Sequence, residues 1–232
     1  MENTVNNKRK SIFTALGAIL LVAVTVLGTI AFLTSQTETV TNTFAFGDVS
    51  FDEDLNGGLD EALVDEYGRP IEVKDGNLVD ADGNYVDKKG NPSETPVPGT
   101  EEDLRVRENG YKLVPGKTYV KDPTAHIKAG SEPAHVYVEV VNGLANFEQA
   151  ELIADQMTRI GWTNVQGNIW RHNDIVDGRD GAKSVVVFEE FTVKDDADTS
   201  QTAEDITVKA FAIQSDNITV EAADAEALAH FN

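Results

Sequence analysis

The chain has 232 residues, carries 40 acidic against 19 basic side chains for a formal net charge of -21 at pH 7, and contains no cysteine. A surface this acidic repels nucleic acid and anionic lipid. It excludes the functions in which a protein binds an anionic partner through a basic patch of its own. Disulfides and thiol nucleophiles are excluded as well, so a domain of this length depends on a buried core.

The N-terminal segment has the layout of a secretion signal. Basic residues at 8–10 precede an uncharged apolar run over 12–33. The run is long enough to cross a bilayer as a helix, so a retained membrane anchor is the alternative to a cleaved signal. Thr29 and Ala31 are small residues at the -3 and -1 positions before Phe32, and we expect cleavage between Ala31 and Phe32.

A strand pattern follows directly after this predicted cleavage site. Between residues 37 and 46, Val40, Phe44 and Phe46 alternate with smaller or polar residues, which is the period-two pattern of a β-strand. Residues 32–51 are therefore interpreted as an N-terminal strand segment, after a signal helix of transmembrane length over 1–31.

The next region, residues 52–108, is interpreted as an acidic, turn-rich insertion. It holds seventeen acidic and six basic side chains, and Gly, Asp, Asn and Pro are frequent in it. Gly76, Gly83 and Gly90 each lie in a turn-forming cluster and are spaced by seven residues. This spacing predicts small hairpins or a ribbon.

The start of the insertion resembles half of a calcium loop. Asp52, Asp54 and Asn56 precede a glycine in the D-x-D-x-N-G pattern, and Asp60 falls at the ninth position. The twelfth position, where the motif requires a bidentate glutamate, is Leu63. A calcium site and a solvated acidic turn are both compatible with this pattern.

The remaining residues, 109–232, return to short strand patterns and are interpreted as the main part of the domain. One amphipathic helix is predicted over 146–160 and a short helical segment over 222–231. Strands are predicted in six places, namely 111–120, 134–141, 162–165, 168–171, 185–193 and 206–213. The predicted fold class is mainly β, a jelly-roll-like β-sandwich with one or two short helices.

Common catalytic motifs are missing from the sequence. The four histidines form no H-E-x-x-H motif, and no serine lies in a G-x-S-x-G elbow. No phosphate-binding G-x-x-x-x-G-K-[ST] loop occurs either. We therefore expect no enzyme activity and no cofactor, with calcium at Asp52, Asp54, Asn56 and Asp60 as the one candidate ligand.

Three segments resemble the bacterial TasA/camelysin family, whose members carry a SipW-dependent type of signal peptide. They are TIAFLTSQTETVTNTFAFGDVS (29–50), LVPGKTYVKDPTAHIKAGSEPAHVYVEV (113–140) and FTVKDDAD with ITVKAFAIQSDN (191–217). The junction of signal and first strand is the most specific part of the resemblance, followed by PGKTYVKDP.

The resemblance implies a jelly-roll subunit that is exported through a dedicated signal peptidase. In fibre-forming members, the N-terminal strand of one subunit completes the sheet of the next. Carried over to this chain, the donor strand lies within residues 32–49 and buries Val40, Phe44 and Phe46. The alternative is that this strand stays in the sheet of its own subunit.

The sequence therefore predicts an exported structural subunit of a bacterial cell-surface or biofilm-matrix fibre. Its expected partners are other copies of itself or homologous fibre subunits and a signal peptidase, with no nucleic acid and with membrane contact only through the signal. Two alternatives remain open: a camelysin-type metallo-endopeptidase, and a membrane-anchored surface adhesin or accessory fibre protein.

Overall fold

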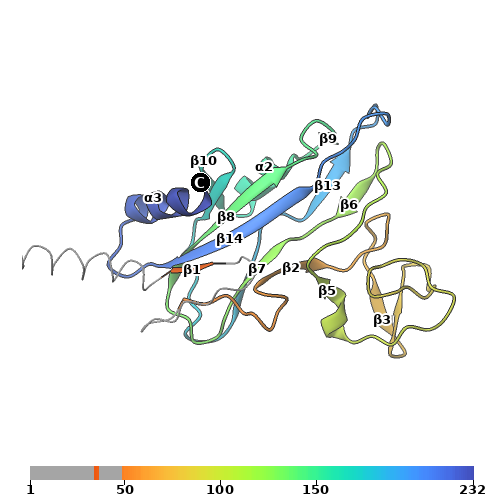
Figure 1. Cartoon of the computed structure of the whole chain (residues 1–232), viewed down its shortest axis with the longest axis horizontal. Helices are drawn as coiled ribbons and strands as arrows, with labels where there is room; N and C mark the ends of the chain where they lie inside the picture. The colour runs from red at the N-terminus through yellow and green to blue at the C-terminus, as the bar shows by residue number, and fades with distance from the viewer. Residues whose placement is uncertain (1–33, 37–48) are drawn as a thin grey trace, which may run out of the picture.

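The computed structural model describes residues 34–36 and 49–232. These residues form several antiparallel sheets and two α-helices, which confirms the prediction of a mainly β fold. Figure 1 shows the two longest strands crossing the body of the molecule, with one helix beside them and a lobe of turns at the other end. No helix in this described part of the chain is long and apolar enough to span a membrane.

The largest sheet has five strands. Its two central strands, β14 (Ile206–Gln214) and β8 (Ala134–Asn142), pair antiparallel along their whole lengths. The other three are the edge strands β1 (Thr34–Gln36) and β10 (Trp162–Gln166), and β11 (Ile169–His172), which joins β10 to β8. Edge strand β1 covers only residues 211–213 of β14.

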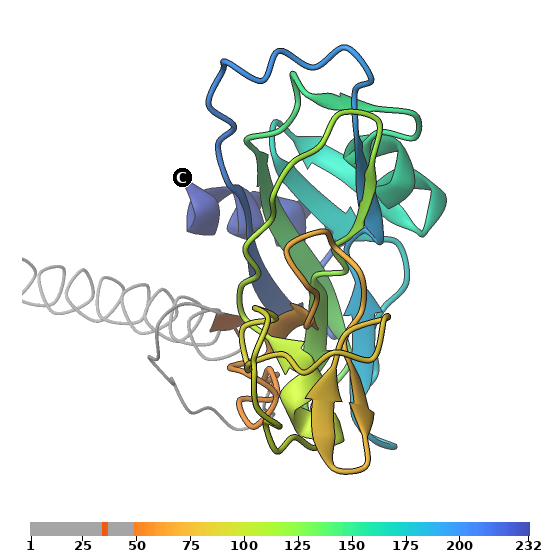
Figure 2. The same cartoon turned by 90° about the vertical axis from the view of Figure 1, so that its right-hand side faces the viewer.

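Two smaller sheets face this sheet across the core, as the turned view in Figure 2 shows. The four-stranded sheet contains, in order, β12 (Lys183–Val186), β7 (Thr124–Ile127), β2 (Leu59–Ala62) and β5 (Arg105–Val106). The three-stranded sheet contains, in order, β6 (Thr118–Val120), β13 (Glu190–Val193) and β9 (Glu148–Gln149).

The core forms because alternate residues of the paired strands face inward. Val136 and Val138 of β8 and Ala210 of β14 pack in one hydrophobic cluster with Ile127 and Phe191 of the facing sheets, and all five are buried. Burial of each large apolar side chain contributes about 1.5–3 kcal/mol. The strand predictions over 134–141 and 206–213 therefore fall on β8 and β14, whereas the single strand predicted over 185–193 is divided between β12 and β13 of different sheets.

The outer face of the large sheet is covered by helix α3 (Val220–Phe231). Thr219 caps it by accepting a hydrogen bond from the Ala222 N–H at 3.3 Å. Ala223 and Ala227 are fully buried against the aromatic face of the sheet, where their small side chains let the helix approach closely.

The second helix, α2 (Ile153–Arg159), is shorter than the pattern over 146–160 predicted. The chain first forms β9, and the buried Glu148 then accepts a hydrogen bond from the Ile153 N–H at 3.3 Å. A carboxylate at the first turn stabilises a helix start, so the helix begins at that point rather than seven residues earlier.

The turn-rich region has a small core of its own. Leu63, Ile71, Leu78 and Val86 are buried together, away from the main cluster. Strands β3 (Glu72–Lys74) and β4 (Asn77–Val79) form a hairpin in this lobe, and a 3-10 turn, η1 (Glu101–Leu104), leads into β5.

A repeated turn builds this lobe. Asp65, Asp80 and Asp87 each accept hydrogen bonds at 2.8–2.9 Å from the backbone N–H groups two and four residues further on. The residue three positions after each is a glycine with a positive φ, between 70° and 84°. The aspartate fixes the turn and the glycine closes it, which agrees with the expectation of small hairpins here.

Candidate functional site

The residues named for export and strand donation lie outside the described part of the chain, while residues 34–36 of the predicted donor segment form β1 beside β14 of the same chain. The named residues are the cleavage residues Thr29, Ala31 and Phe32 and the donor-strand residues Val40, Phe44 and Phe46. Their roles stay predictions.

The predicted calcium ligands are described, but their carboxylates do not converge. Among the described residues, no group of three or more His, Asp or Glu side chains is arranged to hold a metal, so Asp52, Asp54 and Asp60 form no such group. Asn56 directs its Nδ2 to the Arg105 carbonyl at 2.9 Å, and Asp54 is exposed. Calcium binding by this loop stays a prediction.

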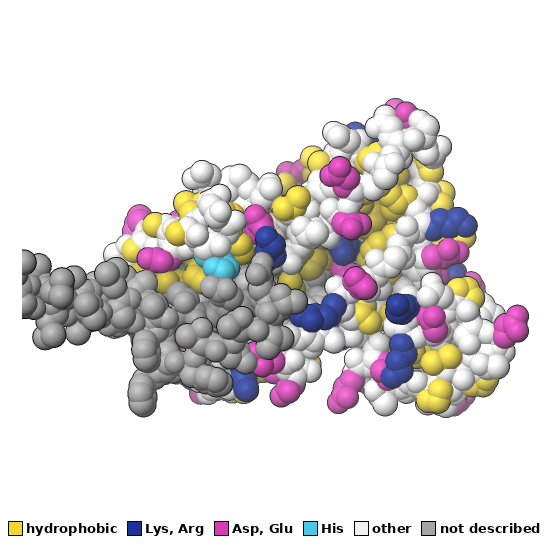
Figure 3. All heavy atoms as spheres, viewed as in Figure 1, with side chains coloured by type: hydrophobic (Ala, Val, Ile, Leu, Met, Phe, Trp, Pro, Cys, Tyr) yellow, Lys and Arg dark blue, Asp and Glu magenta, His cyan; other side chains and the backbone are white. Residues whose placement is uncertain are grey.

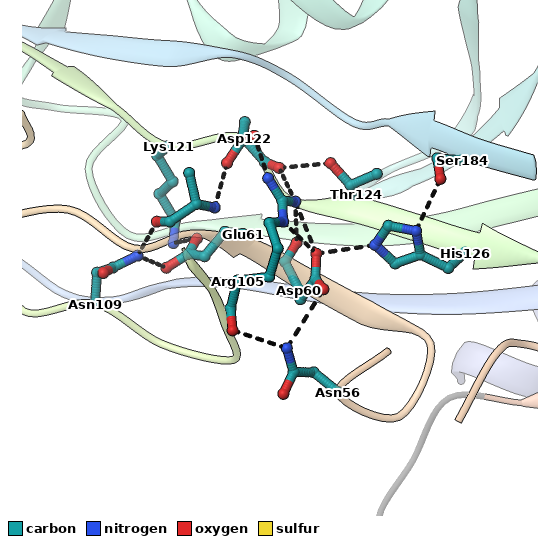
Figure 4. Close-up of polar contacts among 11 residues, drawn as sticks. Asn56, Asp60, Glu61, Arg105, Asn109, Lys121, Asp122, Thr124, His126 and Ser184 are labelled. Carbon is teal, nitrogen blue, oxygen red and sulfur yellow. Dashed lines mark hydrogen bonds and ion pairs between the residues drawn. The ribbon is translucent and has the colours of Figure 1, made fainter. Parts of the chain in front are cut away.

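Asp60 is the centre of a buried polar network, shown in Figure 4. Its Oδ1 lies 2.7 Å from Arg105 Nη2 and 2.9 Å from His126 Nε2. Arg105 also contacts Asp122 at 2.7 Å. Since Asp60 is only 3% exposed, its charge is balanced by Arg105 within the protein and not by water. The network fastens β2 and β5 to β7.

His126 extends this network to an edge strand. Its Nδ1 lies 2.9 Å from the hydroxyl of Ser184 on β12. Carboxylate, imidazole and hydroxyl thus follow one another in the order that serine hydrolases use. Here, however, the carboxylate is also paired with Arg105, so it neutralises a guanidinium besides orienting the imidazole. The chain Asp60–His126–Ser184 therefore ties three strands together.

The environment of Asp60 sets the pH dependence of this network. Burial alone would raise the pKa of Asp60, but hydrogen bonds and charge attraction from His126 and Arg105 together hold it below its ordinary value of 3.8. A carboxyl whose pKa is lowered by folding stabilises the folded state above the unfolded-state value, and this stabilisation is lost as pH falls towards the folded-state value.

We therefore expect wild type to be more stable than Asp60→Asn at pH 7, with a gap that shrinks as pH falls below about 4. Urea unfolding of both proteins between pH 7 and pH 3 measures this gap. Asp177→Asn, at an exposed ion pair with Arg179, is the matched control. A gap that stays constant over this range would show that the charge of Asp60 is not what stabilises the fold.

A second group of polar side chains surrounds Glu61, the next residue of β2. Lys121 Nζ lies 2.5 Å from Glu61 Oε2, and Asn109 Nδ2 donates to Glu61 Oε1 at 2.8 Å. Glu61 is 3% exposed, and Lys121 is mostly buried. One carboxylate thus holds an amine and an amide side by side.

A hollow opens next to this second group. It has a volume of 510 Å³, and its wall includes Asn109, Lys121, Tyr111, Phe191 and residues 203–208. Figure 3 shows hydrophobic side chains gathered in a hollow right of centre on this face. The hollow lies between the start of β14 in the large sheet and the residues of the facing sheets, Phe191 and Lys121.

Most of these residues could not be predicted from the sequence. Arg105 lies 45 positions from Asp60, and Lys121 lies 60 positions from Glu61, so no short spacing connects them. The one available signal was the pair of acidic residues in the strand LDEA (59–62), which is atypical of a β-strand.

No family model, curated protein or solved structure matches this chain. The function of both polar groups and of the hollow is therefore inferred from their own contacts.

Proposed function

We propose that this protein is an exported structural subunit of a bacterial cell-surface or biofilm-matrix fibre, in which copies join by strand exchange. Its layers are proposed to be a jelly-roll-like sandwich that lacks one strand. The N-terminal segment of a neighbouring copy, residues 32–49, supplies that strand. The signal-like N-terminus and the resemblance of three segments to the TasA/camelysin family support export and assembly.

The observation that carries the proposal is an edge of β14 that no described strand fills. Within residues 34–36 and 49–232, no strand pairs with positions 206–208 on the side away from β8. The backbone N–H of Gly143 donates to the Asp205 carbonyl, so the backbone groups of Asp205 point towards the chain of β8. In an antiparallel pair, successive residues point their backbone groups alternately towards the partner strand and away from it. The N–H and C=O of Ile206 and Val208 therefore point outward, where an added strand can pair with them.

The apolar lining of the hollow fits the same occupant. Ile206 and Val208 are partly buried and pack against the main core, together with Tyr111 and Leu113 from across the hollow. A strand laid along this end of β14 would place alternate side chains between the two layers. Val40, Phe44 and Phe46 have the spacing and the apolar character that this position needs.

Register favours a strand from another copy over a strand of the same chain. Thr34 pairs with Ile213, and each step along β1 matches one step back along β14, so the same register sets position 40 opposite Thr207. Thr207 belongs to the outer face of the sheet, which it shares with Phe211. A strand that continues the register of β1 would bury threonines and turn Val40 outward. A strand from another copy is not tied to β1, so it can pair one residue out of that register and turn Val40 inward.

We expect Val208→Asp to block assembly while leaving the domain folded. A carboxylate at this half-buried position meets the incoming apolar side chains without a partner, which costs about 3 kcal/mol and weakens association about a hundredfold. Electron microscopy and size-exclusion chromatography of the mature protein measure fibre formation, and circular dichroism checks the fold.

Val141→Asp is the matched control for this variant. Val141 lies opposite Thr207 on the neighbouring strand, is 41% exposed, and faces away from the hollow. The control is expected to form fibres as wild type does. Fibres of normal length from folded Val208→Asp protein would refute the proposed function.

A further inference from the structure

The contacts of Glu61, Lys121 and Asn109 suggest a covalent bond within the chain. An amine, a carboxamide and one bridging carboxylate are the three groups needed to form an amide between two side chains. Glu61 holds the Lys121 amine through Oε2 at 2.5 Å and the Asn109 amide through Oε1 at 2.8 Å. Figure 4 shows the two side chains converging on this carboxylate from different segments.

The Asn109 amide is held in one orientation. Its Nδ2 donates to Glu61 and also to the Ala62 carbonyl at 2.8 Å, so both of its hydrogens are used. Its Oδ1 accepts the backbone N–H of Val64 at 3.1 Å. A donor on the amide oxygen draws electrons from Cγ and stabilises the negative charge that develops there when a nucleophile attacks.

The Lys121 amine lies in contact with the carboxylate and is largely shielded from water. Lys121 is mostly buried, and its Nζ lies 5.6 Å from the ring centre of Tyr111. Burial in these apolar surroundings raises the pKa of the Tyr111 phenol, with the charge of Glu61 as a further cause. Because Nζ and Oε2 lie 2.5 Å apart, a proton can pass directly from the amine to the carboxylate.

We propose that Lys121 and Asn109 form an intramolecular isopeptide bond, with Glu61 as the acid and base. Glu61 takes a proton from Nζ, and the free amine attacks Cγ of Asn109, so that the Nζ–Cγ bond forms and the electron pair of the C=O moves to Oδ1. Glu61 then protonates Nδ2 and takes a second proton from Nζ. The C=O re-forms, the Cγ–Nδ2 bond breaks, and ammonia leaves.

The reaction needs no oxidant, metal or co-reactant. Lysine amine and asparagine amide give one secondary amide and one ammonia, and Glu61 ends protonated. Asn109 and Lys121 both line the hollow, which gives ammonia a way out. In a chain without cysteine, the bond is a cross-link that does not depend on an oxidising environment. It joins the irregular segment that follows β5 to the residue directly after β6.

Peptide mapping tests the bond directly. Trypsin cleaves after Lys121 only when its amine is free, so the folded full-length protein is denatured, digested and analysed by tandem mass spectrometry. The expected product is peptide 108–112 joined to peptide 118–128, uncut after Lys121 and lighter than their sum by one ammonia. Separate peptides with normal cleavage after Lys121 would overturn the proposal, as would loss of water, which would indicate a bond from Lys121 to Glu61.

Variants assign the roles of the three residues. Glu61→Gln keeps the shape of the side chain but cannot move protons, and it is expected to abolish the cross-linked peptide. Glu139→Gln removes the carboxylate of the surface pair with Lys209, whose atoms lie 2.8 Å apart, and should leave the cross-link unchanged. Lys121→Arg tests the nucleophile instead, because it keeps a positive charge beside Glu61 and is expected to leave peptide 108–112 unlinked. A cross-link that persists in folded Glu61→Gln would contradict the role of Glu61.

Discussion

Replacing Asp60 with alanine is expected to lower the free energy of unfolding by about 3 kcal/mol. Removal of one partner from a buried ion pair leaves the other charge without compensation, which costs about 3–5 kcal/mol. Arg105 keeps Asp122 and is partly exposed, so the lower end of this range applies. For a domain of this size the loss corresponds to a melting temperature about 6–12 °C lower.

Circular dichroism melting at pH 7 measures this effect, with two comparisons. Asp177→Ala removes the carboxylate of an exposed ion pair and is expected to leave the melting temperature unchanged. Ser184→Ala removes only the last hydrogen bond of the network, from an exposed position on β12, so its effect should be much smaller than that of Asp60→Ala. An equal loss in all three variants would show that the network does not fasten β2 to β7.

Local patterns predicted the strands that form the core. Val136, Val138 and Val140 alternate in the sequence, and the structure buries all three on the inner face of β8. This succeeded because the side chains on the inner face of a strand recur every two residues, whatever lies opposite. The class of fold could be predicted for the same reason.

The polar network could not be predicted in this way. Asp60 and Glu61 read as part of a solvated acidic region, yet both are buried. Their burial depends on cations supplied by Arg105 and Lys121, which only the folded topology brings to β2. A charge is buried when a partner compensates it, and a sequence pattern does not show a partner that lies tens of residues away.

Deleting residues 32–48 from the mature protein, which keeps the buried Val49, is expected to abolish fibres and leave a folded monomer. Burial of Val40, Phe44 and Phe46 between copies would contribute roughly 1.5–3 kcal/mol for each side chain, besides the sheet hydrogen bonds. Without them the remaining interface is too weak to hold copies together. Size exclusion, circular dichroism and electron microscopy of the deletion variant measure assembly and fold together.

A synthetic peptide of residues 32–49 provides the control for this deletion. It should bind the monomer and raise its melting temperature, because it fills the hollow beside Ile206 and Val208. If the strand instead closes its own domain, the deletion variant should unfold and expose its core. Fibres that form normally without residues 32–48 would refute the role of this segment.

Strand exchange between copies is tested most directly by disulfide trapping, which the absence of cysteine makes clean. One copy carries Thr207→Cys, a second, isotope-labelled copy carries a single cysteine scanned over positions 39–44, and the two are mixed and oxidised during assembly. The account predicts a disulfide between labelled and unlabelled chains at alternate scanned positions, detected by mass spectrometry. A separate protein carries both cysteines in one chain. Disulfides that form only within that chain, and never between labelled and unlabelled copies, would contradict the account.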